Sequence, residues 1–141
     1  MKRILVALDG SPRAPQVLAT AVRLAQMSGA KLLLYRAIGI SPDVPREAWL
    51  QSESFEDVLI RHGRAQLERL AEAAPKELLE GILTGFATPW DGICTLAKER
   101  DVDLVVIGSH GFGVVDRVLG TVAAKVVNHA DRNVLVVRTA L

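Results

Sequence analysis

The sequence contains very little cysteine and few aromatic side chains. Cys94 is the single cysteine among 141 residues, which excludes an internal disulfide and leaves no cysteine cluster for a metal. Aromatic residues make up 4% of the chain, although half of all residues are hydrophobic. The core must therefore be built from Leu, Val, Ile and Ala, a composition typical of a parallel sheet covered by helices.

The sequence also lacks an excess of charge and a long hydrophobic run. Seventeen basic residues stand against 16 acidic ones, so the net charge is +1 and predicts no binding to nucleic acid or to a membrane surface. Only five apolar residues separate the opening Met1-Lys2-Arg3 from Asp9, which is too short for a signal peptide or a membrane span. We expect a single cytoplasmic domain over residues 1–141.

Predicted strands and helices alternate along the chain. Apolar runs that end at turn residues predict five buried strands, at residues 3–8, 31–38, 81–86, 103–107 and 133–137. Helical spacing predicts four helices, at residues 13–28, 55–74, 88–100 and 120–129. Right-handed crossovers then give an α/β fold, an open, doubly wound, Rossmann-like sheet of five parallel strands in the order 3-2-1-4-5. A ligand is expected where the strand order reverses, between strands one and four.

A glycine-rich loop follows the fourth predicted strand. It begins at Gly108-Ser109-His110-Gly111-Phe112-Gly113, and the last helix starts after it at Gly120-Thr121. Glycine allows the backbone to approach a ligand closely, and a helix N-terminus favours negative charge. Asp9 ends the first strand, so both features meet at one crevice. This arrangement predicts a phosphate-binding site.

Three familiar nucleotide-binding patterns do not fit. Neither the first nor the fourth strand is followed by a Walker A sequence, and the turn after the first strand holds only Gly10 instead of a dinucleotide fingerprint. A phosphoacceptor receiver domain would need an acidic pair beside Asp9 and a lysine after strand five, where Arg138 stands.

The chain resembles the universal stress protein family along its whole length. The family's first strand ends in Asp-x-Ser, here Asp9-Gly10-Ser11. Its fourth strand runs into Gly-x-x-Gly, here residues 108–111, and later Gly-Ser/Thr, here Gly120-Thr121. Residues 127–138 are similar to the family's C-terminal helix-to-strand turn. The two glycine elements are separated by eight residues instead of the usual nine, and we expect the loop to shorten while both anchors stay in place.

The resemblance implies binding of ATP, with Mg²⁺, because family members that keep these glycines bind ATP. Asp9 would face the ribose and the Mg²⁺–phosphate region and is the one candidate metal contact. Adenine would lie in an apolar slot, and the glycine loop and the last helix would hold the ribose and phosphates. The candidate ligand-binding residues are Ala7, Asp9, Ala37, Ile107, Gly108, His110, Gly111, Gly113, Gly120, Thr121 and Val122.

We expect a homodimeric ATP-binding switch or sensor in stress response. Family members pair through the last strand, and Val134–Val137 forms an apolar edge that needs a cover. No catalytic residue is assigned, and hydrolysis would be slow because no positioned general base is evident. Two alternatives stay open. One is a weak ATPase or autophosphorylating phosphotransferase that uses Ser109, Ser11 or Thr121 as acceptor, and the other is a nucleotide-free dimeric adaptor.

Several residues also have plainer interpretations. Asp9 suits a turn or a helix N-cap. His110 is expected to hydrogen-bond a ligand or water and not to act as a base. Arg36 ends the second strand, from which its side chain would reach the crevice mouth. His62 falls on the apolar face of its helix and is expected at the edge of the core.

Overall fold

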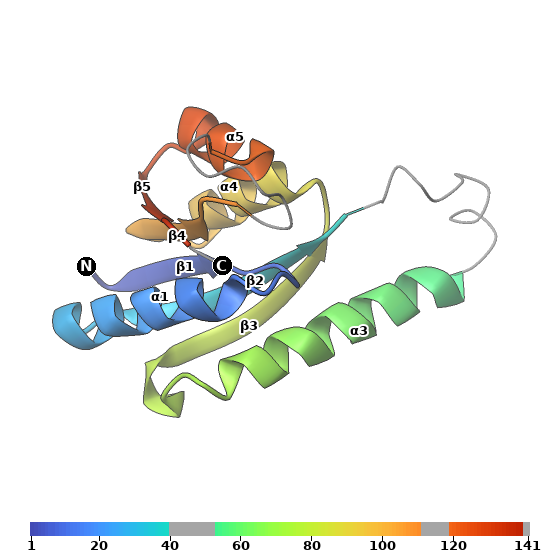
Figure 1. Cartoon of the computed structure of the whole chain (residues 1–141), viewed down its shortest axis with the longest axis horizontal. Coiled ribbons are helices and arrows are strands. Elements are labelled where there is room, and N and C mark those ends of the chain that lie inside the picture. The colour runs from blue at the N-terminus through green and yellow to red at the C-terminus, as the bar shows by residue number, and fades with distance from the viewer. Residues whose placement is uncertain (40–52, 111–118, 140–141) are drawn as a thin grey trace.

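The computed structural model describes residues 1–39, 53–110 and 119–139 (Figure 1). Strands and helices alternate as the sequence predicts. In chain order they are β1 (Arg3–Ala7), α1 (Ala14–Ser28), β2 (Lys31–Ile38), α3 (Glu53–Ala71), a 3₁₀ turn (Lys76–Leu78), β3 (Leu79–Phe86), α4 (Pro89–Glu99), β4 (Leu104–Gly108), α5 (Thr121–His129) and β5 (Asn133–Val137).

The strands form one parallel sheet in the order β3-β2-β1-β4-β5. This confirms the predicted α/β fold and its strand order. β1 lies between β2 and β4, with Val6 in register with Val106. The chain leaves the sheet in opposite directions from β1 and β4, so their carboxyl ends flank the point where the strand order reverses.

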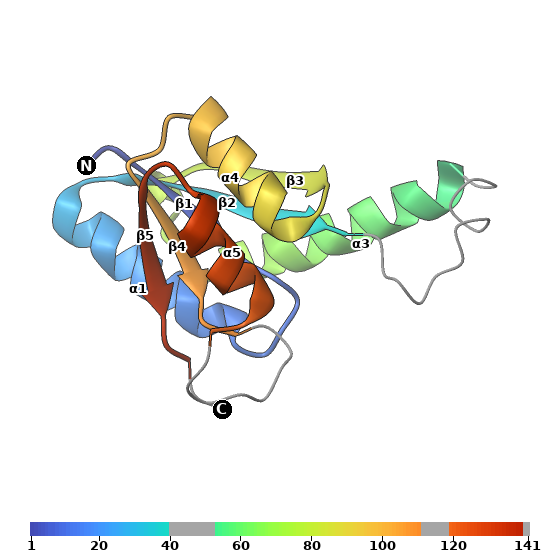
Figure 2. The same ribbon diagram turned by 90° about the horizontal axis from the view of Figure 1, so that it is seen from above.

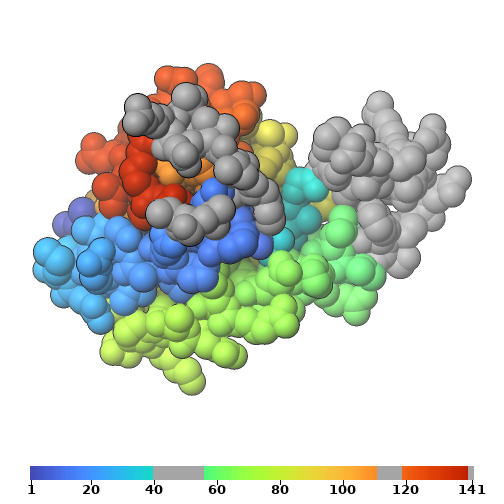
Figure 3. All heavy atoms as spheres, in the orientation of Figure 1, coloured from blue at the N-terminus to red at the C-terminus, as the bar shows by residue number. Residues whose placement is uncertain are grey.

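Helices cover both faces of the sheet (Figures 1 and 2). α1 and α3 pack on one face against the side chains of Ile4 and Val6, while α4 and α5 pack on the other against Leu5. Figure 3 shows α1 beside the C-terminal part of α3 on the near face. Because successive residues of β1 are buried on opposite faces, its apolar run is continuous instead of alternating.

Local sequence sets the helix ends. Gly29 has a φ of 77°, and its N–H donates to the Ala25 carbonyl at 2.8 Å, which ends α1 as predicted. Thr88 stands at the N-cap of α4 and Pro89 at its first position, although the Thr88 hydroxyl makes no capping hydrogen bond. β3 begins at Leu79, two residues before the predicted start. Among the described residues, no helix is long and apolar enough to cross a membrane.

Candidate functional site

A cavity of about 590 Å³ lies at the carboxyl ends of β1 and β4. Nine of the predicted ligand-binding residues line it: Ala7, Asp9, Ala37, Ile107, Gly108, His110, Gly120, Thr121 and Val122. The fold therefore brings together residues that are up to 115 positions apart in the sequence, from Ala7 to Val122. The other two predicted residues, Gly111 and Gly113, lie outside the described residues. The volume is within the range of small-molecule sites in proteins.

The turn between β1 and α1 forms one wall of the cavity. The Ser11 backbone N–H donates to Asp9 Oδ1 at 2.9 Å, and the Arg13 N–H donates to Ser11 Oγ at 3.3 Å. Asp9 is thus a turn residue, as its plainer interpretation predicts, and its exposed side chain also lines the cavity. These two bonds turn the chain sharply into α1 and bring Arg13 to the cavity wall.

The segment after β4 forms the opposite wall. The Ser109 N–H donates to the Val137 carbonyl at 2.8 Å, and the Ser109 carbonyl accepts from the Gly120 N–H at 2.8 Å. Ser109 Oγ lies 3.1 Å from His110 Nδ1. The end of β4 is therefore tied both to β5 and to the start of α5, which places the N-terminus of α5 at the cavity.

The start of α5 is suited to an anion. Gly120 occupies the N-cap and has no side chain with which to cap the helix, and the first helical bond runs from the Ala124 N–H to the Gly120 carbonyl at 2.9 Å. The N–H groups of the first turn, at Thr121, Val122 and Ala123, have no partner within the helix. A methyl group at Gly120 would stand 3.1 Å from the Ser109 carbonyl oxygen, so glycine permits this close approach.

The cavity also has apolar lining residues. Ala7, Ala37 and Ile107, which the sequence analysis assigns to an adenine slot, are among them, and Tyr35 adds an aromatic side chain. Burial raises the pKa of the Tyr35 phenol, so the phenol is neutral at physiological pH. Its hydroxyl fits between β3 and α4 because both neighbours are glycines, and a methyl group at Gly92 would stand 2.5 Å from it.

Three buried polar or charged side chains are found among the described residues, and all three line this cavity. Ser11, Arg13 and Ser109 are 5%, 6% and 1% exposed. Sequence reasoning named both serines as possible phosphate acceptors but assigned no role to Arg13. A signal for Arg13 was present, because a basic residue at the start of a helix opposes the usual preference for acidic residues there.

Arg36 does not line the cavity, so the prediction that it reaches the crevice mouth is wrong. Its guanidinium turns towards α3, where Nη1 donates to Gln66 Oε1, and it packs against Gly10, where a methyl group would stand 3.0 Å from Nη2. Burial lowers the pKa of Arg36, and the nearby negative charge of Asp9 acts in the opposite direction. His62 is exposed and contacts Gln66, so its expected place at the core edge is also wrong.

The described residues contain no group of three or more His, Cys, Asp or Glu side chains that could hold a metal ion. Asp9 is the only carboxylate among the described residues that line the cavity. A single carboxylate is a usual protein contribution to Mg²⁺ held mainly by phosphates and water. The residues present therefore fit a metal that arrives with a phosphorylated ligand.

The fold and the cavity together define a doubly wound α/β protein in which apolar side chains and the N-terminus of α5 line one cavity. The universal stress protein family model matches residues 1–138. A universal stress protein of Thermus aquaticus, named for its place in the QAH/OAS sulfhydrylase 3′ region, is 35% identical over 142 residues, covering 97% of this chain and 98% of its own length. The chain belongs to the universal stress protein family, as its motifs predict.

Solved structures agree with this assignment. A universal stress protein from Lactobacillus plantarum is similar with a TM-score of 0.78 and 26% identity, covering 97% of both chains. A universal stress protein solved in complex with cAMP has a TM-score of 0.62 and 26% identity, covering 99% of this chain and 98% of its own. The family prediction is confirmed, whereas membership of the ATP-binding subgroup stays a prediction.

Proposed function

We propose that this protein binds ATP with Mg²⁺ in the cavity and acts as a nucleotide-dependent homodimeric switch or sensor in stress response. One observation carries the proposal: an apolar slot and the N-terminus of α5 open into the same cavity. Adenine would lie against Ala7, Ala37 and Ile107, and the phosphates would lie towards Gly120 and Thr121. The site residues would act within a single domain in the cytoplasm.

A relative supports the class of ligand. The universal stress protein that was solved with cAMP has the same fold at 26% identity over nearly the whole chain. cAMP shares its adenine, ribose and phosphate with ATP. The additional phosphates of ATP would lie along the polar wall formed by the β1–α1 turn and the start of α5.

The geometry favours holding the nucleotide over consuming it. The His110 ring lies against the Ser109 hydroxyl, with Nδ1 at 3.1 Å from Oγ, and Asp9 Oδ1 accepts a backbone hydrogen bond from Ser11. Neither group is arranged as a base that activates an attacking water. Ser109 is 1% exposed, which disfavours it as a phosphate acceptor. Any hydrolysis would therefore be slow.

The homodimer would form through β5, which is an edge strand of the sheet. Val134, Leu135 and Val137 pack against the core clusters, which leaves Val136 as the β5 valine outside both. Val136→Lys is expected to convert the dimer to a monomer in light scattering, with the melting temperature of the monomer retained. A wild-type monomer at micromolar concentration would contradict the dimer.

The nucleotide is tested by mass spectrometry of small molecules released from protein that was purified without added nucleotide. ATP is the expected result, and calorimetry with added Mg-ATP should show one site per chain. Release of AMP or cAMP alone would correct the ligand. The absence of any nucleotide, with no thermal shift on adding ATP, would favour the adaptor. Incorporation of labelled phosphate that Ser109→Ala, Ser11→Ala or Thr121→Ala abolishes would favour the phosphotransferase.

A further inference from the structure

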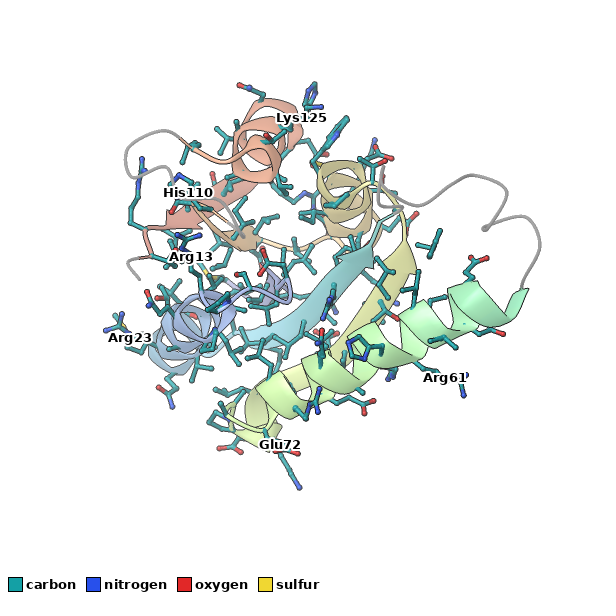
Figure 4. The ribbon with its side chains drawn as sticks, turned by 45° about the vertical axis from the view of Figure 1, so that its right-hand side comes forward. Arg13, Arg23, Arg61, Glu72, His110 and Lys125 are labelled. Atoms are coloured by element: carbon teal, nitrogen blue, oxygen red, sulfur yellow. The ribbon has the colours of Figure 1, made fainter. Side chains whose placement is uncertain are left out.

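Arg13 places a buried cation in the wall of the cavity. It occupies the N-cap position of α1, is 6% exposed and lines the cavity with Ser11 and Ser109. Figure 4 shows Arg13 below His110, in the region between α1 and the end of β4. Both residues line the same cavity, Arg13 from the start of α1 and His110 from the segment after β4.

The surroundings of Arg13 add positive potential. The first turns of α1 and α5 both begin at the cavity, and neither contains an acidic residue. α4 is a useful contrast, because it carries Asp91 in its first turn, where a carboxylate interacts favourably with the helix dipole. A guanidinium at the N-terminus of α1 has the same sign as the positive end of the helix dipole, so a negative charge in the cavity would interact favourably with both.

Asp9, a carboxylate that lines the cavity, is exposed, whereas Arg13 is buried. Asp9 Oδ1 accepts the Ser11 N–H, and the negative charge of Asp9 also raises the pKa of Arg36. Among the described residues that line the cavity, one exposed carboxylate thus accompanies a buried guanidinium and the N-terminus of α5. The resulting field favours a ligand with several negative charges.

We infer that Arg13 is the residue that makes this site selective for phosphate charge, binding the phosphate chain of the nucleotide. The inference rests on the proposed function and assigns the selectivity to a side chain that sequence motifs did not indicate. A guanidinium forms two parallel hydrogen bonds to a phosphate and stays charged at all physiological pH values. Affinity should therefore rise with the number of phosphate charges, and that dependence should require Arg13.

The test compares three probes by calorimetry at one fixed salt concentration: ATP, inorganic triphosphate and adenosine. Arg13→Gln is expected to weaken ATP and triphosphate by about tenfold to a hundredfold, because a hydrogen bond between charged groups is lost, and to leave adenosine unchanged. Arg13→Lys keeps the charge and is expected to fall between wild type and Arg13→Gln. Arg23→Gln is the matched control, since Arg23 is exposed on the same helix away from the cavity (Figure 4).

Equal losses for all three probes would show a structural role and overturn the inference, as would unchanged ATP binding by Arg13→Gln. Melting curves without ligand establish that each variant is folded. If Arg13→Gln does not fold, the affinities of Arg13→Lys for the three probes test the inference instead. A wild-type protein that binds triphosphate through Arg13 but binds no adenine nucleotide would overturn the proposed function alone. A wild-type protein that binds none of the probes would overturn both.

Discussion

The amino and carboxyl ends of the sheet differ in how far their charged side chains are buried. At the amino end, charged side chains lie at the surface and have partners within the protein. Arg3 forms an ion pair with Glu80 at 2.7 Å, and the Asp103 carboxylate accepts the backbone N–H groups of Lys2 and Arg3 at 2.6 and 2.9 Å. At the carboxyl end, Ser11, Arg13 and Ser109 are buried, and all three line one cavity beside the exposed Asp9.

The contacts at the amino end are structural, whereas the buried polar side chains at the carboxyl end lie at the proposed binding site. These surface contacts link the start of β1 to the starts of β3 and β4 and remain hydrated, so each contributes little to stability. At the carboxyl end, the buried hydroxyls of Ser11 and Ser109 have hydrogen-bond contacts within the protein, and the buried guanidinium of Arg13 lines the cavity with them. This arrangement supports the proposed binding site at the carboxyl end, where ligands bind in this class of sheet.

The largest expected effect is on ligand binding by Gly120→Val. The added side chain would meet the Ser109 carbonyl oxygen, 3.1 Å from the position of its first carbon, and would obstruct the first turn of α5. We expect ATP affinity, measured by calorimetry, to fall by about a hundredfold or more, since several hydrogen bonds to phosphate would be lost together.

A glycine far from the cavity provides the control. Gly29 has a φ of 77° at the end of α1 and has no other atom within 4 Å of an added carbon. Asparagine can adopt this left-handed conformation at a helix end, so the ATP affinity of Gly29→Asn should match that of wild type. Full ATP affinity in Gly120→Val would contradict the assignment of the carboxyl end as the binding end.

An intermediate effect is expected from Asp9→Asn. The amide oxygen can still accept the Ser11 N–H, so the turn should persist, but the negative charge that would attract Mg²⁺ is lost. We expect affinity for Mg-ATP to fall by about tenfold, the size of one charged interaction, and affinity for ATP in the presence of EDTA to stay level or rise. Parallel titrations with Mg²⁺ and with EDTA measure this. A uniform loss in both would mean that Asp9 acts only through the turn.

The smallest effect is expected at the amino end, from Glu80→Gln. The hydrogen bond from Arg3 lowers the pKa of Glu80, so ionised Glu80 stabilises the fold above its ordinary pKa of about 4.3. That contribution is lost as the pH falls through the lowered pKa. Because the pair is exposed, Glu80→Gln should cost less than about 1 kcal/mol of unfolding free energy at pH 7.

Urea unfolding of wild type and Glu80→Gln at pH 7 and at pH 3 measures this difference, which should shrink at the lower pH. ATP affinity should not change, since Glu80 is the second residue of β3, at the end remote from the cavity. A loss of affinity in Glu80→Gln would break the division between the two ends of the sheet.

Much of the fold follows from local pattern. Continuous apolar runs mark strands that are buried on both faces, and the limits of β2 and β5 agree with those predicted. Gly29 and Pro89 mark helix ends because their backbone preferences act within a few residues. Boundaries that depend on packing were predicted less accurately. The helix predicted over residues 55–74 corresponds to α3, which begins earlier, at Glu53, and ends earlier, at Ala71.

The sequence by itself determined the family, the order of elements and the two motifs, Asp9-Gly10-Ser11 and the glycine loop after β4, whose described residues meet at one cavity. Only the tertiary structure decided what the individual polar side chains do. Arg13 and Arg36 both flank the expected crevice in the sequence, yet the turn after β1 buries Arg13 in the cavity while Gly10 and Gln66 hold Arg36 against α3. The physical reason is that the direction of a long side chain depends on the space left by residues distant in sequence, which local pattern does not contain.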